Sequence, residues 1–205
     1  MPTSYSESIP TIVKVLEDKK PKKVLDIGTG NGKYGLLTKE YCGQDVIIDG
    51  IEAWKPYLTD THKSIYRNIF IDDVTKMSLK SLEKYDIYLM IDVIEHLPKT
   101  TAHRILRELN GLILISTPIE DYRAHYENHF EDHVSHWKIA DFTERYKTET
   151  HSTNLSTIVL IDTSIKKSDS QNEINRLNNE LRRIYNSKSW RLTKPLRAIN
   201  HIFNR

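Results

Sequence analysis

The feature that most limits the fold of this chain is a short apolar segment followed at once by a glycine-rich turn. Residues 23–35 are KVLDIGTGNGKYG. The apolar part predicts a buried strand, because Pro21 bounds it on one side and glycine on the other. Glycines after a strand allow a tight turn and a close approach to a ligand, and a helix starting near Gly32 directs free N–H groups at that ligand. The sequence therefore predicts a site for a nucleotide-like cofactor.

Two classes of cofactor suit a strand, a glycine-rich turn and a helix. The dinucleotide fingerprint G-x-G-x-x-G fits Gly28 and Gly30, but Lys33 occupies the position of its third glycine. A literal match begins only at Gly30, two residues beyond the strand. Asp26, inside the strand end, suits a ligand with a cationic amino-acid part better than a pyrophosphate. The frame D-x-G-x-G-x-G, from Asp26 to Gly32, resembles motif I of the class I S-adenosylmethionine-dependent methyltransferases.

Two further predicted strands end in acids that suit a nucleoside. Residues 46–52 place Glu52 at a strand tip, where a carboxylate accepts hydrogen bonds from ribose hydroxyls, although NAD sites use the same device. Residues 69–74 end in Asp73 and Val74, and the methyltransferase pattern places an acid and a small apolar residue at the adenine edge. A lone acid at a strand end is more often a cap or a turn former. That plainer role is expected for Asp49, Asp72 and Asp86.

The fourth predicted strand carries the strongest resemblance. Residues 85–97 are YDIYLMIDVIEHL and are similar to the family's fourth strand and the segment after it, YD…DV(I/L)EHL. A fifth strand is expected from Gly111 to Ser116. With four strand-tip features in this order, residues 8–162 are identified as a class I methyltransferase. The resemblance implies S-adenosylmethionine as the cofactor. The residues that it implies for binding are Asp26, Gly28, Gly30, Gly32, Glu52, Asp73, Val74 and Asp92.

The order of the predicted elements indicates an α/β fold. Helices are expected over residues 8–16, 33–41, 55–64 and 100–109. Their alternation with strands is typical of a parallel doubly wound sheet. Residues 146–151 and 156–161 predict an antiparallel hairpin, and the resemblance implies that it completes a Rossmann-like sheet of seven strands. This domain is expected to span residues 1–165, with a basic helical tail over residues 166–205.

The segment between the fifth strand and the hairpin is expected to contact the methyl acceptor. Residues 121–137 hold four of the nine histidines. Residues 128–137 are similar to an N-x-[YF]-E-x-H-x-S-x-W stretch of some bacterial methyltransferases, in which this loop lies over the methyl donor. His133 is the expected general base or substrate-orienting residue, because imidazole has a pKa near neutrality. His96 is the second catalytic candidate, and a structural tie between a helix start and the sheet is its alternative role.

The same histidines have a spacing that could suit a metal site. His129, His133 and His136 are spaced i, i+4 and i+7, which on a helix is one face. The zinc-protease form H-E-x-x-H is absent, because Phe130 stands in place of its glutamate. The asparagine and aromatic residues nearby favour a loop over a helix. The sequence therefore predicts no metal site.

Composition and charge limit the compartment and the class of substrate that we expect for the protein. Cys42 is the single cysteine, so no intramolecular disulfide forms, and a reducing, cytoplasmic compartment is expected. No secretion signal or long apolar run is present. The net charge is +2, but residues 166–205 alone carry ten Lys or Arg and three acids. The remaining domain is therefore acidic, which argues against nucleic acid as the substrate, because phosphates need basic partners.

The basic tail suggests a second kind of contact. Ile174, Leu177, Leu181 and Ile184 repeat over two heptads, fewer than a coiled coil needs. Residues 187–197 resemble the S-x-S-W-R-[LIV]-T-x-P-[LI]-R tail of many enzymes of surface-polysaccharide assembly. Basic residues mixed with Trp and Leu also suit an anionic membrane surface. The expected contacts are a peripheral one with the membrane or one with a pathway partner, and the oligomeric state is left open.

These features together predict an S-adenosylmethionine-dependent O-methyltransferase that acts on a sugar hydroxyl in the biosynthesis of a surface glycan or polysaccharide. Two alternatives are left open at this stage. The first is methylation of a small molecule or a lipid. The second is a non-catalytic adaptor that binds the donor and recruits glycan enzymes through its tail.

Overall fold

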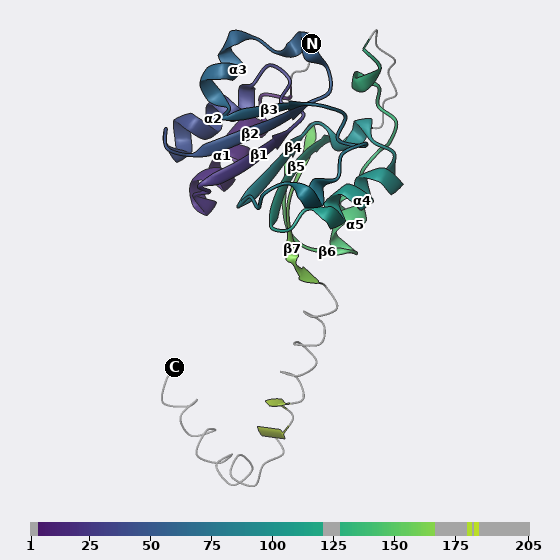
Figure 1. Ribbon diagram of the computed structural model, residues 1–205. Coiled ribbons are helices and arrows are strands. Elements are labelled where there is room, and N and C mark those ends of the chain that lie inside the picture. The colour runs from purple at the N-terminus through teal and green to yellow at the C-terminus, as the bar shows by residue number, and fades with distance from the viewer. Residues whose placement is uncertain (1–3, 121–127, 167–179, 182, 185–205) are drawn as a thin grey trace. The chain divides into compact units, whose positions relative to one another are not determined.

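The structure, a computed structural model, describes residues 4–120, 128–166, 180–181 and 183–184 (Figure 1). The chain divides into two compact units, Met1–Ser164 and Ile165–Arg205. Most of the predicted tail, including Ile174, Leu177 and residues 187–197, lies outside the described residues. Among the residues that are described, no helix is both long and apolar enough to cross a membrane.

A seven-stranded sheet forms the centre of the first unit, in the order β3-β2-β1-β4-β5-β7-β6. The strands are β1 (Lys23–Ile27), β2 (Ile47–Glu52), β3 (Asn68–Ile71), β4 (Ile87–Ile91), β5 (Leu112–Pro118), β6 (Tyr146–Ser152) and β7 (Ser156–Lys166). The first five pair in parallel, and β7 pairs antiparallel to β5. The predicted Rossmann-like sheet with a C-terminal antiparallel hairpin is therefore confirmed.

Helices cover both faces of this sheet (Figure 1). One face packs against α1 (Ser8–Lys19), α2 (Lys33–Cys42) and α3 (Asp60–Ile65). The other packs against α4 (Lys99–Glu108) and α5 (Ile139–Thr143). Because both faces are covered, β4 is buried at every position, which explains its unbroken apolar sequence IYLMI.

The structure corrects three of the predicted boundaries. The helix predicted over 55–64 is two elements, the 3₁₀-helix η1 (Lys55–Tyr57) and α3. Thr59 is extended between them and donates its backbone N–H to Nδ1 of His62, which starts the new helix. The third strand ends at Ile71 and leaves Asp72 and Asp73 in the following turn. The last strand continues beyond residue 161 to Lys166.

Gly35 marks the closest approach of α2 to the end of α3. A Cβ at this position lies 2.5 Å from Cζ of Tyr66 and 2.7 Å from Cγ2 of Ile65. The ring of Tyr66 cannot move away freely, because its hydroxyl donates a 2.6 Å hydrogen bond to Asp26. The glycine is therefore required by packing and not by its backbone angles.

We predict that Gly35→Ala lowers the free energy of unfolding by about 1–3 kcal/mol, the usual cost of overpacking. This loss outweighs the gain of about 1 kcal/mol that alanine brings to a helix interior. Urea denaturation of the full chain measures it. Leu36→Ala, in the same helix but 53% exposed, is the control and is expected to change stability by less than about 0.5 kcal/mol. A stabilised Gly35→Ala protein would contradict the packing argument.

Candidate functional site

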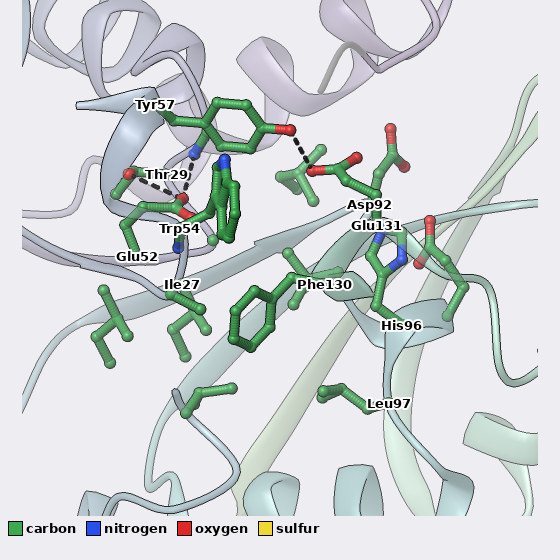
Figure 2. A pocket seen from close by; sticks show the side chains of 18 of the residues that line it. Ile27, Thr29, Glu52, Trp54, Tyr57, Asp92, His96, Leu97, Phe130 and Glu131 are labelled. Carbon is green, nitrogen blue, oxygen red and sulfur yellow. Dashed lines mark hydrogen bonds between the residues drawn. The ribbon is translucent and has the colours of Figure 1, made fainter. Parts of the chain in front are cut away.

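A cavity of about 1000 Å³ opens at the carboxyl edge of the sheet, next to β1 and β4 (Figure 2). Strand order reverses between these two strands, and open α/β sheets bind ligands at such a point. Eight of the ten residues predicted from the sequence line it: Gly28, Gly30, Glu52, Asp73, Val74, Asp92, His96 and His133. The structure thus places residues from distant parts of the sequence in one cavity.

The glycine-rich turn that follows β1 lines the cavity. Gly28, Gly30 and Gly32 have φ angles of +77°, +51° and +81°, which glycine adopts without strain. A Cβ at Gly28 also lies 2.5 Å from Cγ2 of Val93 in the loop after β4. The turn is tied to β2, since the backbone N–H of Gly28 donates to the carbonyl of Ile51 at 2.8 Å. These constraints bring bare backbone to the cavity surface.

Two predicted cofactor residues, Asp26 and Gly32, do not line the cavity. The side chain of Asp26 is buried behind the turn, where it accepts the hydrogen bond from Tyr66. Burial raises the pKa of Asp26 to about 7. Gly32 is the N-cap of α2 and packs beside His62 and Ile65. Both residues support the turn from the side away from the cavity. Asp26 lies there because side chains alternate between the two faces of a strand, and its own points towards α2 and α3.

His62 supports the turn from α3, and the sequence analysis did not identify it. Its Nδ1 accepts from the backbone N–H of Thr59 at 3.1 Å, so the proton is on Nε2. Nε2 then donates to the carbonyl of Gly30 at 3.0 Å. The ring is buried and stacks on Tyr66, with centroids 5.7 Å apart. No sequence pattern indicates this contact, because it depends on how α3 packs against the turn.

Glu52, at the end of β2, is held in place by backbone donors. Its Oε2 accepts from the N–H of Gly30 at 2.8 Å, and its Oε1 accepts from the N–H of Trp54 at 2.8 Å. The Thr29 hydroxyl also donates to Oε2, at 3.4 Å (Figure 2). Burial raises the pKa of this carboxyl. Oε2 has two donors and Oε1 has one, so Oε1 of the fixed carboxylate can still accept a hydrogen bond from a ligand in the cavity.

Asp73 and Val74 line the cavity wall beyond β3. Asp73 Oδ1 accepts from both the N–H and the hydroxyl of Thr75, at 2.9 and 2.7 Å, which fixes the turn. Asp92 follows β4 on the other side with a φ of +53°, an uncommon angle for a residue other than glycine. Its Oδ1 accepts from the hydroxyl of Ser116 at 2.9 Å, and burial raises the pKa of its carboxyl.

Glu95, His96 and His133 meet at the far end of the cavity. Glu95 and His96 belong to the 3₁₀-helix η3 (Ile94–His96), and the rings of His96 and His133 are edge to face with centroids 4.9 Å apart. Burial raises the pKa of Glu95 well above its usual range, and the charge of Asp92 adds to this. Thr117 lowers the pKa of Glu95 and so opposes part of this rise, although its hydroxyl forms no hydrogen bond of normal geometry with the carboxyl. Burial and then the His96 charge lower the pKa of His133.

Aromatic residues that the sequence analysis did not assign complete the lining. Trp54 follows Glu52, and its ring lies 6.4 Å from that of Phe130 in the 3₁₀-helix η4 (His129–Glu131). The hydroxyl of Tyr57 donates to Oε1 of Glu131 at 3.0 Å, which joins η1 to η4 across the cavity (Figure 2). The signal in the sequence that could have identified these residues is their position in the segments that follow β2 and β5.

The described lining is strongly acidic. It contains one lysine, Lys33, against six carboxylates. These are Asp72, Asp73, Glu52, Asp92, Glu95 and Glu131. Such a surface favours a cationic or neutral ligand over a phosphate.

Comparison with known proteins gives the class. A family model described as a methyltransferase domain matches residues 2–191. The chain belongs to this family. The search of curated proteins finds no match.

Solved structures share the fold of this methyltransferase at low sequence identity. They include a Nostoc punctiforme protein described as an O-methyltransferase (TM-score 0.58, 16% identity, 77% of this chain and 56% of that chain). The N-terminal domain of EvdMO1, solved with SAH and D-fucose, has a TM-score of 0.57 and 14% identity over 78% and 84% of the two chains. Magnesium protoporphyrin IX methyltransferase from Synechocystis PCC 6803, solved with SAM, has a TM-score of 0.52 and 15% identity over 76% and 78%. The chain thus spans little more than half of the Nostoc protein.

The predicted class, an S-adenosylmethionine-dependent methyltransferase, is confirmed by the family and the fold. The residues present fit this cofactor. The turn at Gly28 exposes backbone where a side chain has no room, and Glu52 is a fixed acceptor at the tip of β2. The acidic lining attracts the positive sulfonium. The roles of the individual residues stay predictions.

We predict that Glu52→Ala weakens binding of S-adenosylmethionine by about 1–3 kcal/mol, the range for hydrogen bonds to a charged group. The loss has two causes, because the mutation removes acceptors for the ligand and for the N–H groups of Gly30 and Trp54. Calorimetric titration with S-adenosylmethionine, and with NAD for comparison, measures it. Glu40→Ala on the exposed face of α2 is the control. Binding of NAD alone by the wild type would overturn the cofactor assignment.

Proposed function

We propose that this methyltransferase methylates a hydroxyl of a neutral sugar during assembly of a surface glycan. The observation that carries the proposal is the lining of the cavity beyond Glu52. It combines the rings of Trp54 and Phe130 with polar groups of Tyr57 and Glu131. A sugar ring has apolar C–H faces and hydroxyl edges, so it suits aromatic faces beside hydrogen-bonding side chains.

Charge favours a neutral acceptor over one that carries phosphate. The six carboxylates of the described lining repel a nucleotide sugar or a nucleic acid, and Lys33 alone cannot offset them. The EvdMO1 domain is an example of this fold whose structure was determined in the presence of SAH and D-fucose. The Synechocystis enzyme acts on magnesium protoporphyrin IX, so the fold alone does not select the acceptor.

The protein's part in the reaction is to orient two ligands and to accept a proton. When bound, S-adenosylmethionine supplies an electrophilic methyl group and leaves as a neutral thioether. The wall of β1 and β2 suits the donor, and the end at His96 and His133 suits the acceptor. An acceptor hydroxyl that took up the methyl group would have to give up its proton, to a protein group such as His133 or to solvent. Burial keeps His133 neutral near pH 7, because it lowers the pKa of this imidazole.

A screen with isotopically labelled S-adenosylmethionine tests the proposal. Mass spectrometry follows the label into neutral oligosaccharides, nucleotide sugars, phenols and lipids. We expect transfer to neutral oligosaccharides, faster than to the matching nucleotide sugars. Transfer only to phenols or lipids would overturn the sugar acceptor and leave the methyltransferase assignment intact.

We predict that His133→Ala lowers turnover by roughly 10²- to 10⁴-fold, the span of acid–base contributions, while donor affinity holds. Single-turnover kinetics and calorimetry separate the two quantities. His136→Ala is the matched control, because His136 belongs to the same segment and does not line the cavity. Normal turnover in His133→Ala would remove this side chain from the reaction.

We further propose that the basic tail mediates association with an anionic membrane or with a pathway partner. Of its described residues, Leu181 and Ile184 are half exposed, which suits an apolar contact with a partner. The +7 charge of residues 166–205 suits anionic lipid.

We predict that a chain ending at Lys166 keeps its fold and its affinity for S-adenosylmethionine, because β7 ends there. Co-sedimentation with phosphatidylserine vesicles should be lost. For the full chain, a membrane contact weakens with salt, since surface attraction falls off within about 8 Å at physiological ionic strength. A partner contact through apolar residues resists salt. Unfolding of the shortened chain would show that the tail belongs to the domain.

A further inference from the structure

Glu95 is a buried carboxylate without a visible counterpart. It is 2% exposed, and neither Oε1 nor Oε2 has a hydrogen-bond partner among the described residues. Leaving a buried carboxylate unsatisfied costs several kcal/mol, so folded proteins normally supply a cation or donors to such a group. Glu95 lines the cavity. A ligand entering the cavity can therefore supply what the protein does not.

Two imidazoles accompany this carboxylate. Glu95, His96 and His133 each offer one ligand atom, and all three atoms lie within 4.8 Å of one another. Three ligands at 2.0–2.2 Å from one ion in tetrahedral or trigonal geometry lie about 3.3–3.8 Å apart, so side-chain movements of up to roughly 1 Å bring all three onto an ion. One carboxylate and two imidazoles form a common set of ligands for divalent transition metals.

The imidazole of His96 is already oriented for such a role. Its Nδ1 lies 3.1 Å from the carbonyl oxygen of Asp132, which can only accept, so Nδ1 carries the proton and Nε2 retains its lone pair. Metal-binding histidines usually donate their other N–H to a carbonyl or carboxylate in this way.

Hydrogen bonds outside the cluster hold its two segments together. The carbonyl of Glu95 accepts from the N–H groups of Val134 and Ser135, at 2.9 and 3.0 Å. The Ser135 hydroxyl donates to the carbonyl of Leu97 at 2.7 Å, and Nε1 of Trp137 donates to that of Ile94 at 3.1 Å. These bonds hold His133 beside η3 without any ligand, so the cluster is preorganised.

The charge around the cluster favours a cation. Asp92 and Glu131 line the same cavity and add two carboxylates to that of Glu95. Their mutual repulsion in a partly buried site is relieved when a divalent ion binds.

We propose that Glu95, His96 and His133 bind a divalent metal ion of the class that accepts mixed nitrogen and oxygen ligands, such as Mn²⁺ or Zn²⁺. The inference rests on the cluster and does not depend on a sugar acceptor. Three protein ligands leave coordination positions open to the cavity, where a bound hydroxyl would lose its proton more readily. His133 is then a metal ligand in place of the base predicted from the sequence. The helical set of His129, His133 and His136 does not form, since residues 132–138 are not helical.

Calorimetric titration of the full chain with Mn²⁺ alone, after chelation and dialysis, tests the site, with Mg²⁺ as the comparison ion. We expect one Mn²⁺ site, with weaker Mg²⁺ binding because Mg²⁺ prefers oxygen ligands. Glu95→Gln and His133→Ala should each lower Mn²⁺ affinity about 10- to 100-fold. His136→Ala, from the same segment but outside the cluster, should retain the wild-type affinity.

Thermal unfolding gives a second readout that does not need activity. Mn²⁺ should raise the Tm of the wild type and leave that of Glu95→Gln unchanged. Without metal, Glu95→Gln should be about as stable as the wild type, because glutamine has nearly the same shape as glutamate and carries no charge to bury. This result would also show that the variant folds.

The outcomes separate this inference from the proposed function. No Mn²⁺ binding, or binding that Glu95→Gln leaves unchanged, would overturn the metal site. Methyl transfer to sugars by the chelated enzyme would also overturn a metal role and would leave the proposed function standing. Mn²⁺ binding lost in Glu95→Gln, together with no transfer to any sugar, would support the metal site and overturn the sugar acceptor.

Discussion

The ligand cavity of this protein depends on the parallel pairing of β1 with β2 on one side and with β4 on the other. Strand order reverses at this point, so the chain leaving β1 must turn between two neighbouring strand ends. Glycine at position 28 permits that turn against Val93, and it places bare backbone between Glu52 and Asp92. The cavity follows from this one crowded junction.

The sequence predicted this junction well because its causes are local. Alternating glycines after an apolar strand need positive φ angles, and Gly28, Gly30 and Gly32 have them. Acids at strand ends share one edge of a parallel sheet, which brought Glu52, Asp73 and Asp92 together as expected. The spacing of Asp26 from the turn does not reveal that its side chain turns back to Tyr66, so its place outside the cavity lining could not be read from the sequence.

The other end of the cavity was less predictable because it depends on packing between distant segments. His62 reaches the turn only through the position of α3, and η3 meets residues 132–137 through hydrogen bonds between backbone groups that no side-chain pattern encodes. The sequence predicts a loop over residues 128–137 with His133 as the base, and the structure places His133 beside His96 and Glu95. Ser135 and Trp137 matched a family pattern, and the structure shows that they fasten this segment to η3.

The acidic lining of the cavity has a consequence for the end of the catalytic cycle. A sulfonium is positive and a thioether is neutral, so methyl transfer removes the positive charge that the six carboxylates of the lining attract. The thioether product is therefore attracted to the lining less strongly than the sulfonium donor. The same surface that recruits the donor thereby favours its exchange after each turnover, and raised ionic strength narrows this difference between fresh and spent cofactor.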